Sequence, residues 1–161
     1  MSDERAAGRV RTARMADLTS VLRLMEQYWA YEGICGFAAD ALAPLLRRLL
    51  SEPGLGKVWV AEGAPPAELA GYLVAVKVLS LEHRGIMAEI DELFVEPGQR
   101  AAGLGSALLA HAEADLSADG CTRVQLQLGI DNESARSFYL RHGFIPRAGY
   151  ALWDKPLPEG R

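Results

Sequence analysis

The chain has 161 residues, which is the length of one domain. Half of its residues are hydrophobic and its net charge is −4, so the composition favours a globular protein and argues against nucleic-acid binding, which needs a basic surface. Its two cysteines, Cys35 and Cys121, are too few for a disulfide scaffold and follow no metal-ligand spacing, so we expect free thiols and no metal.

The N-terminal residues contain no apolar core of signal-peptide length, and no apolar run approaches the length of a membrane span. We therefore expect a cytoplasmic protein with neither a membrane nor a nucleic-acid partner. No internal repeat, low-complexity tract or interdomain linker divides the chain. We expect a flexible N-terminal tail at residues 1–8, a single domain at 9–157 and a C-terminal tail at 158–161.

The hydrophobic pattern changes between the two-residue period of strands and the 3.6-residue period of helices. The expected elements are, in chain order, a strand at 9–13, a helix from Asp17 that Gly33 and Gly36 interrupt, a helix at 38–50, strands at 57–62, 68–80 and 86–95, a helix at 103–117, a strand at 123–130, a helix after the N-cap Asn132 that Gly143 ends, and short strands at 144–146 and 150–155. Pro44 fits a helix only in the first turn, so the second helix should start near Asp40. This order predicts an α/β fold with a single mixed, mostly antiparallel central sheet flanked by helices.

A strand, a turn and a helix follow one another directly between Ile90 and Leu109. Gly103 and Gly105 at this turn let the backbone approach a ligand closely. The unpaired N–H groups and positive dipole of the following helix can bind phosphate, and Arg100 can add a charge-assisted contact. The residues required for a dinucleotide fingerprint or a Walker loop are absent, which leaves a purely structural loop as the alternative.

The spacing Arg100-x-x-Gly103-x-Gly105, placed five residues after Val95, resembles motif A of the GNAT superfamily of N-acetyltransferases. Residues 132–144, NESARSFYLRHGF, are similar to a second family signature, N-x-x-A-x-x-x-Y-x-x-x-G-F. The two motifs occur in the family's order with a strand between them. The resemblance covers roughly residues 9–157 and implies a GNAT-like acyl-CoA N-acyltransferase fold with acetyl-CoA as co-substrate.

One departure from the family concerns positions 101 and 102. The family often has glycine and then a basic residue there, whereas this chain has Ala101 and Ala102. Alanine still allows close approach in a helical conformation, but the missing cation weakens the expected hold on the CoA phosphates.

The resemblance implies a set of contacts to acetyl-CoA. The end of the 86–95 strand would pair with the pantetheine arm as an added strand does, the Val95 N–H would polarise the thioester carbonyl, the turn amides would hold the pyrophosphate, and Asn132 would contact the arm. The implied cofactor-binding residues are Leu93, Phe94, Val95, Arg100, Ala101, Ala102, Gly103, Leu104, Gly105, Ser106, Asn132 and Tyr139.

Tyr139 matches the general acid of the family, which protonates the leaving CoA thiolate. Its periodicity alone gives a different interpretation, because it shares a helical face with Ala135 and Phe138 and would then be a core aromatic residue.

The general base is open among Glu89, Asp91 and Glu92, which cluster on the strand leading to the thioester. Alternation predicts Glu89 and Asp91 on one face, together with Leu93 and Val95, and Glu92 on the other. Glu89 matches the base of histone-type members, and Asp91-Glu92 matches an acidic pair of polyamine-acetylating members. A carboxylate whose pKa is raised by burial would suit a base, and a solvated acidic strand face is the alternative.

Tyr28, Tyr31 and Glu32 end the first long helix, in the region that walls the acceptor site of the family. The aromatic rings could pack on an alkylamine, and Glu32 could pair with a cation. Ordinary packing at a helix end with an exposed glutamate is the alternative interpretation.

The sequence therefore predicts an acetyl-CoA-dependent N-acetyltransferase that acts on a primary amine by direct attack, with a small-molecule, polyamine-like acceptor favoured. A non-catalytic acyl-CoA-binding module and a protein lysine or N-terminal acetyltransferase are the alternatives. The resemblance also makes a homodimer an expectation.

Overall fold

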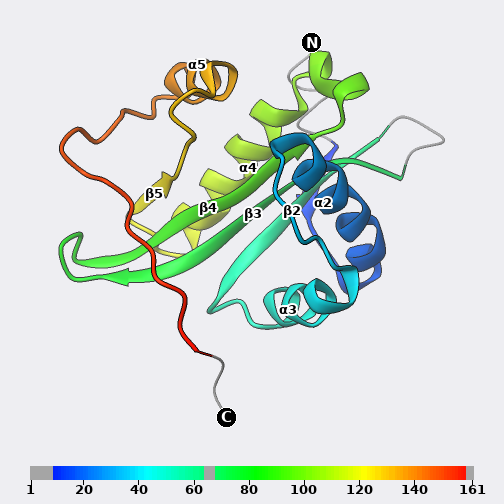
Figure 1. Cartoon of the computed structure of the whole chain (residues 1–161), viewed down its shortest axis with the longest axis horizontal. Helices are drawn as coiled ribbons and strands as arrows, with labels where there is room; N and C mark the ends of the chain where they lie inside the picture. Colours follow the sequence, from blue (N-terminus) through cyan, green and yellow to red (C-terminus); the bar gives the residue numbers. More distant parts are fainter. Residues whose placement is uncertain (1–8, 64–67, 159–161) are drawn as a thin grey trace. The chain divides into compact units, whose positions relative to one another are not determined.

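The computed structural model of the chain describes residues 9–63 and 68–158 (Figure 1). The expected tail at 1–8 lies outside these residues. The chain forms two compact units, Met1–Gln127 and Leu128–Arg161. None of the described helices is both long and apolar enough to cross a membrane.

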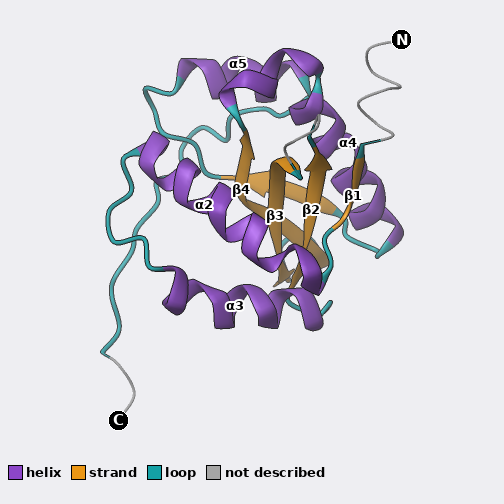
Figure 2. Ribbon diagram, turned by 90° about the vertical axis from the view of Figure 1, so that its right-hand side faces the viewer, coloured by secondary structure: helices purple, strands orange, loops and turns teal. Residues whose placement is uncertain are grey.

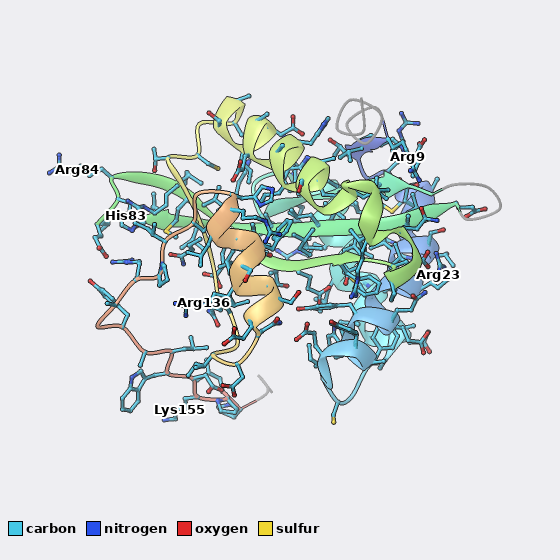
Figure 3. All side chains as sticks on the ribbon, turned by 90° about the horizontal axis from the view of Figure 1, so that it is seen from above. Arg9, Arg23, His83, Arg84, Arg136 and Lys155 are labelled. Atoms are coloured by element: carbon cyan, nitrogen blue, oxygen red, sulfur yellow. The ribbon has the colours of Figure 1, made fainter. Side chains whose placement is uncertain are left out.

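A five-stranded sheet forms the centre of the first unit. Its strands are β1 (Val10–Thr12), β2 (Gly56–Glu62), β3 (Leu69–Ser80), β4 (Gly85–Val95) and β5 (Arg123–Leu126). They lie side by side in chain order, antiparallel except for the parallel pair β4 and β5. Figure 3 shows His83 and Arg84 at the tip of the long β3–β4 hairpin, at the opposite end of the sheet from Arg23. The predicted mixed, mostly antiparallel sheet is confirmed.

Helices cover both faces of this sheet (Figure 2). The elements are the 3₁₀ turn η1 (Met15–Asp17), α2 (Leu18–Glu32), α3 (Ala39–Ser51), the 3₁₀ segment η2 (Pro97–Ala102) and α4 (Leu104–Ala118). On β2, Val58 and Val60 pack with Leu24 of α2 in one buried cluster. Trp59 between them points to the other face, where its Nε1–H donates to Asp115 of α4 at 2.8 Å. The strand alternation thus divides the core between α2 and α3 on one side and α4 on the other.

Pro44 corrects one expectation about α3. The helix begins at Ala39, so Pro44 lies beyond its first turn rather than within it. Proline at this position leaves the carbonyl of Asp40 without its helical donor. Both Pro44 and Asp40 are exposed to solvent, so water can satisfy that carbonyl and the helix continues.

The strands expected at 144–146 and 150–155 do not form, and β5 ends at Leu126 rather than at residue 130. The second unit instead contains α5 (Glu133–Arg141) followed by irregular chain. Pro146 has no N–H to donate to a strand ladder, and Gly149 adopts a left-handed φ of 85° between the two segments. Alternating apolar residues predict that one face of an extended segment is buried. A strand also needs a neighbouring strand to which its backbone can hydrogen-bond, and the alternation does not provide one.

We expect Trp59→Phe to lower the free energy of unfolding by about 1–3 kcal/mol, because it removes packing volume and the donor to Asp115. Trp59 is fully buried, whereas Trp153 is 89% exposed. Trp153→Phe is therefore the matched control and should change stability by less than about 0.5 kcal/mol. Urea unfolding followed by circular dichroism measures both, and equal losses would contradict this account of how α4 is held.

Candidate active site

A β-bulge in β4 arranges the three acids of that strand. The consecutive β3 residues Val74 and Ala75 pair with Glu92 and Ile90, so Asp91 is an extra residue. Glu89 pairs with Val76, and Val74 and Val76 share a face because side chains alternate along a strand. Glu89 and Glu92 therefore lie on the same face.

This register corrects the predicted orientation of the acids. Uninterrupted alternation placed Glu92 opposite Glu89 and grouped Glu89 with Leu93 and Val95. Leu93 pairs with Leu73, and Leu73 pairs with Trp59, which faces α4. The extra residue reverses the alternation, so Leu93 faces α4 and Glu89 faces the side that α2 covers.

Glu92 is held by two neutral donors from different elements. The Tyr72 hydroxyl on β3 donates to its Oε2 at 2.6 Å, and the Trp29 Nε1–H on α2 donates to its Oε1 at 2.8 Å. Burial raises the pKa of Glu92, which the two hydrogen bonds oppose and the charge of Asp91 reinforces. The same burial, together with the charge of Glu92, raises the pKa of the Tyr72 hydroxyl strongly.

Glu89 and Asp91 have different surroundings from Glu92. Gln125 and Gln127 donate from their amide groups to the two oxygens of Glu89, at 2.7 and 3.0 Å. Asp91 is exposed, but the protein around it removes part of its hydration, which raises its pKa, and the charge of Glu89 adds to the shift. The cluster therefore contains one carboxylate fixed by amides and one that is open to solvent with a raised pKa.

The end of α2 lies beside these acids. The Tyr28 ring packs on Phe94 with 6.0 Å between ring centroids. Burial raises the pKa of Tyr28 to about 12, and the charges of Glu32, Glu92 and Asp91 contribute. The structure thus brings the predicted residues Tyr28 and Glu32 to the acids of β4. Gly33, with a left-handed φ of 69°, ends the helix immediately afterwards.

Tyr31 belongs to the same helix end and contacts Arg100. The Arg100 guanidinium lies 4.7 Å from the Tyr31 ring centroid and 5.8 Å from that of Phe94, and its Nε–H donates to the Val95 carbonyl at 3.0 Å. Arg100, predicted as a phosphate contact, therefore lies between the end of β4 and the aromatic end of α2.

The end of β4 presents backbone groups that no neighbouring strand of the described residues pairs. The Glu96 N–H donates to the Ala70 carbonyl on β3 at 2.8 Å. Because successive peptide groups of a strand point to opposite edges, the groups of Phe94 also point to β3, and those of Leu93 and Val95 point away from it. The pairing of β5 with β4 ends at Ile90, so within the described part of the chain no strand covers this further edge.

A helix N-terminus follows this edge directly. Gly103 joins η2 to α4 in a left-handed conformation with φ 73°, which glycine adopts without strain. Ala101 and Ala102 lie in η2, and Leu104, Gly105 and Ser106 form the first turn of α4. The positive end of the helix dipole is therefore located where the sequence predicts a phosphate site.

Two predicted site residues belong to the second unit. Asn132 caps α5, since its Oδ1 accepts from the Ala135 N–H at 3.1 Å, as predicted. The Tyr139 ring packs edge-on against Phe138 and Phe144, at 5.1 and 5.3 Å between centroids.

Sequence reasoning missed the side chains that donate to the acids: Trp29, Tyr72, Gln125 and Gln127. One feature of the sequence could have indicated such donors: three acids lie within four positions of a central strand. Burying their carboxylates is unfavourable unless hydrogen-bond donors lie nearby. The identity of those donors depends on the bulge and on elements distant in sequence. Among the described residues, no group of three or more His, Cys, Asp or Glu side chains is placed to hold a metal ion.

Comparison with protein families gives a match over residues 21–144 to the acetyltransferase (GNAT) family. Both motifs singled out in the sequence lie within these residues.

Individual relatives agree with this match. The aminoalkylphosphonate N-acetyltransferase of Salmonella typhimurium is 33% identical over 110 residues, which cover 68% of this chain and 63% of that enzyme. The aminoglycoside N(6')-acetyltransferase type 1 of Klebsiella aerogenes is 27% identical over 92% of this chain and 96% of that enzyme. The crystal structure of an integron cassette protein from the mobile metagenome of Cole Harbour Salt Marsh superposes with a TM-score of 0.81 and 27% identity, covering 96% of this chain and 93% of that protein. The chain thus spans less than two thirds of the Salmonella enzyme and nearly all of the Klebsiella enzyme.

Proposed function

The chain belongs to the acetyltransferase (GNAT) family, and we propose that it transfers an acetyl group from acetyl-CoA to the primary amine of a small cationic molecule. That it is an N-acetyltransferase follows from the family and from relatives that bear this name. The observation that supports the finer proposal is the β4 bulge, which gathers acids beside a strand edge that no strand of the described residues covers. The acids offer a base, and the edge offers a place for the acyl donor.

The donor set along β4 and α4 fits acetyl-CoA. The outward N–H and C=O of Leu93 would bind the pantetheine amides as an added strand does, whereas the Val95 carbonyl already accepts from Arg100. The Val95 N–H would polarise the thioester carbonyl, and the amides in the first turn of α4 would hold the pyrophosphate. Arg100 would add a charge-assisted contact to a phosphate, and Asn132 would contact the arm.

Acetyl transfer by direct attack needs two proton movements. As the amine nitrogen bonds to the acetyl carbon and the carbon–sulfur bond breaks, nitrogen loses one proton and sulfur gains another. Asp91 is the favoured base, because it is exposed to solvent and its pKa is raised. Tyr139 would donate the proton to the thiolate, as its position in the family signature implies.

The charge around the acceptor wall favours a polycationic amine. Glu32, Asp91 and Glu92 all act on Tyr28 through their negative charges. A second cationic group on the acceptor would be attracted to this cluster, whereas an anionic group would be repelled. Polyamines and aminoglycosides are therefore favoured over aminoalkylphosphonates, in keeping with the name of the Klebsiella relative.

The match to the family crosses both compact units, which supports one catalytic domain at residues 9–157. The cytoplasmic location and the homodimer stay predictions.

A thiol-release assay tests the proposed function. Purified protein with acetyl-CoA should release free CoA at least about tenfold faster with spermidine or kanamycin than without an amine. Stimulation only by a lysine peptide would indicate a protein acetyltransferase, and stimulation only by 2-aminoethylphosphonate would contradict the cationic acceptor. Without stimulation by any of these amines, the proposal fails.

We expect Asp91→Asn to lower kcat/KM for the amine by about 10²–10⁴-fold and to remove the acidic limb of its pH profile. The base works only when deprotonated, so wild-type activity should fall as the pH drops through the raised pKa of Asp91. Initial rates across the pH range measure this limb. Glu89→Gln is the comparison, and loss of the limb in that variant alone would transfer the role of base to Glu89.

We expect Tyr139→Phe to lower kcat by roughly 10²-fold with little change in acetyl-CoA affinity, since the hydroxyl proposed to protonate the thiolate is lost and the ring is kept. Steady-state kinetics and calorimetric titration with acetyl-CoA separate the two quantities. Tyr150→Phe is the matched control, because Tyr150 is 71% exposed. Unchanged turnover in Tyr139→Phe would leave Tyr139 as a packing residue.

A further inference from the structure

Glu92 accepts hydrogen bonds on both carboxylate oxygens, and the two donors belong to different layers of the first unit. Tyr72 lies on β3 at the centre of the sheet, and Trp29 lies in the last turn of α2. Hydrogen bonds to a carboxylate are shorter and stronger than bonds between neutral groups. Partial burial strengthens them further, because the local dielectric is low. The carboxylate therefore ties the end of α2 to the sheet.

Trp29 lies next to the other aromatic residues at the end of α2, so the bond that fixes Trp29 also restricts their positions. The Trp29 ring also meets Phe37 edge-on, at 5.6 Å between centroids, where the chain passes from α2 to α3. Tyr28 packs on Phe94, and Tyr31 lies under the guanidinium of Arg100. All three aromatic residues of α2 lie within four positions of one helix, so an anchor at Trp29 also sets where Tyr28 and Tyr31 lie.

The adjacent acid, Asp91, lacks such an anchor. Within the described residues, no side-chain hydrogen bond or ion pair to Asp91 is present, and its side chain is exposed. A proton taken up by Glu92 would require a partner to change its role, for example the Tyr72 hydroxyl from donor to acceptor, and Tyr72 is held in place because it is fully buried. The bulge thus gives two neighbouring carboxylates different surroundings: Asp91 can exchange protons freely, and Glu92 is immobilised.

We propose that Glu92 is a positioning residue: acting through Trp29, it fixes the aromatic end of α2 against β4 and so determines which amines fit the acceptor side. This inference rests on the proposed acetyl transfer, because it takes the end of α2 as the acceptor wall. In this scheme Glu92 determines the shape of the acceptor side, and another carboxylate takes the proton from the amine.

The kinetic test compares Glu92→Ala, Trp29→Phe and Glu92→Gln, with spermidine and kanamycin as acceptors. The first two changes break the Trp29–Glu92 bond and should raise KM for the amine about tenfold, with a much smaller change in kcat. Glutamine keeps an acceptor oxygen for the indole and an amide for the Tyr72 oxygen, so Glu92→Gln should raise KM less than Glu92→Ala. The acidic limb of the pH profile should persist in all three variants.

Two kinetic outcomes would overturn the proposal. One is loss of turnover and of the acidic limb in Glu92→Gln, which would make Glu92 the base. The other is an unchanged KM for both amines in Trp29→Phe. Trp153→Phe controls for the loss of an indole at an exposed position, and if Glu92→Ala fails to fold, Trp29→Phe and Glu92→Gln still decide.

Hydrogen–deuterium exchange of the protein alone separates this proposal from the proposed function. A peptide covering residues 26–37 should exchange faster in Trp29→Phe than in the wild type, and a peptide covering β2 should not change. Unchanged exchange at 26–37 would overturn the positioning role even if amines are acetylated. Faster exchange would support that role even if the thiol assay shows that the amine class was wrong.

Discussion

The insertion of Asp91 between the β3 partners of Ile90 and Glu92 is the constraint on which the rest of the site depends. With regular alternation, Glu89 and Glu92 would lie on opposite faces, and one of them would face the side covered by α4, where Leu104, Leu108 and Leu109 are fully buried. An unpaired carboxylate there would cost several kcal/mol. The extra residue brings both acids to one face, and beyond it the peptide groups of Leu93 and Val95 point to an edge that β5 no longer covers.

The helix α2 is attached to β4 beside both proposed substrate positions. Arg23 and Gln27 donate to Glu96, the residue after β4, at 2.8 and 3.2 Å, and Trp29 donates to Glu92 within the strand. One helix therefore holds both ends of residues 92–96. The Arg23–Glu96 ion pair is partly exposed and contributes little on its own, whereas the more buried bond to Glu92 is harder to replace. Since the proposed acceptor wall and the proposed donor edge flank the same five residues, we expect a shift of either one to move the other.

Sequence patterns predicted the elements well where local chemistry determines them. The strand expected at 86–95 is Gly85–Val95, and Asn132 caps its helix as expected, because periodicity and capping are local properties. The three acids were also found, since a cluster of charges on a central strand is visible in the sequence. Their faces were predicted wrongly, because a bulge depends on the pairing between β3 and β4. The strands expected at 144–146 and 150–155 failed for a related reason: alternation does not provide a partner strand.

The way in which the fold stabilises its acids is compatible with the role proposed for them in acetyl transfer. Glu89 and Glu92 are held by amide, phenol and indole donors, which are neutral and leave the negative charge of the cluster intact. Asp119, at the C-terminal end of α4, shows the alternative: Lys57 and Lys77 bond to it at 2.9 and 3.0 Å and lower its pKa. Lysines at the β4 cluster would likewise lower the pKa of a base and cancel the attraction for a protonated amine. Partial burial raises the pKa of Asp91, and the charge of Glu89, which its neutral donors do not cancel, adds to the shift. The cluster thus keeps a negative potential beside the edge where the acyl donor would bind.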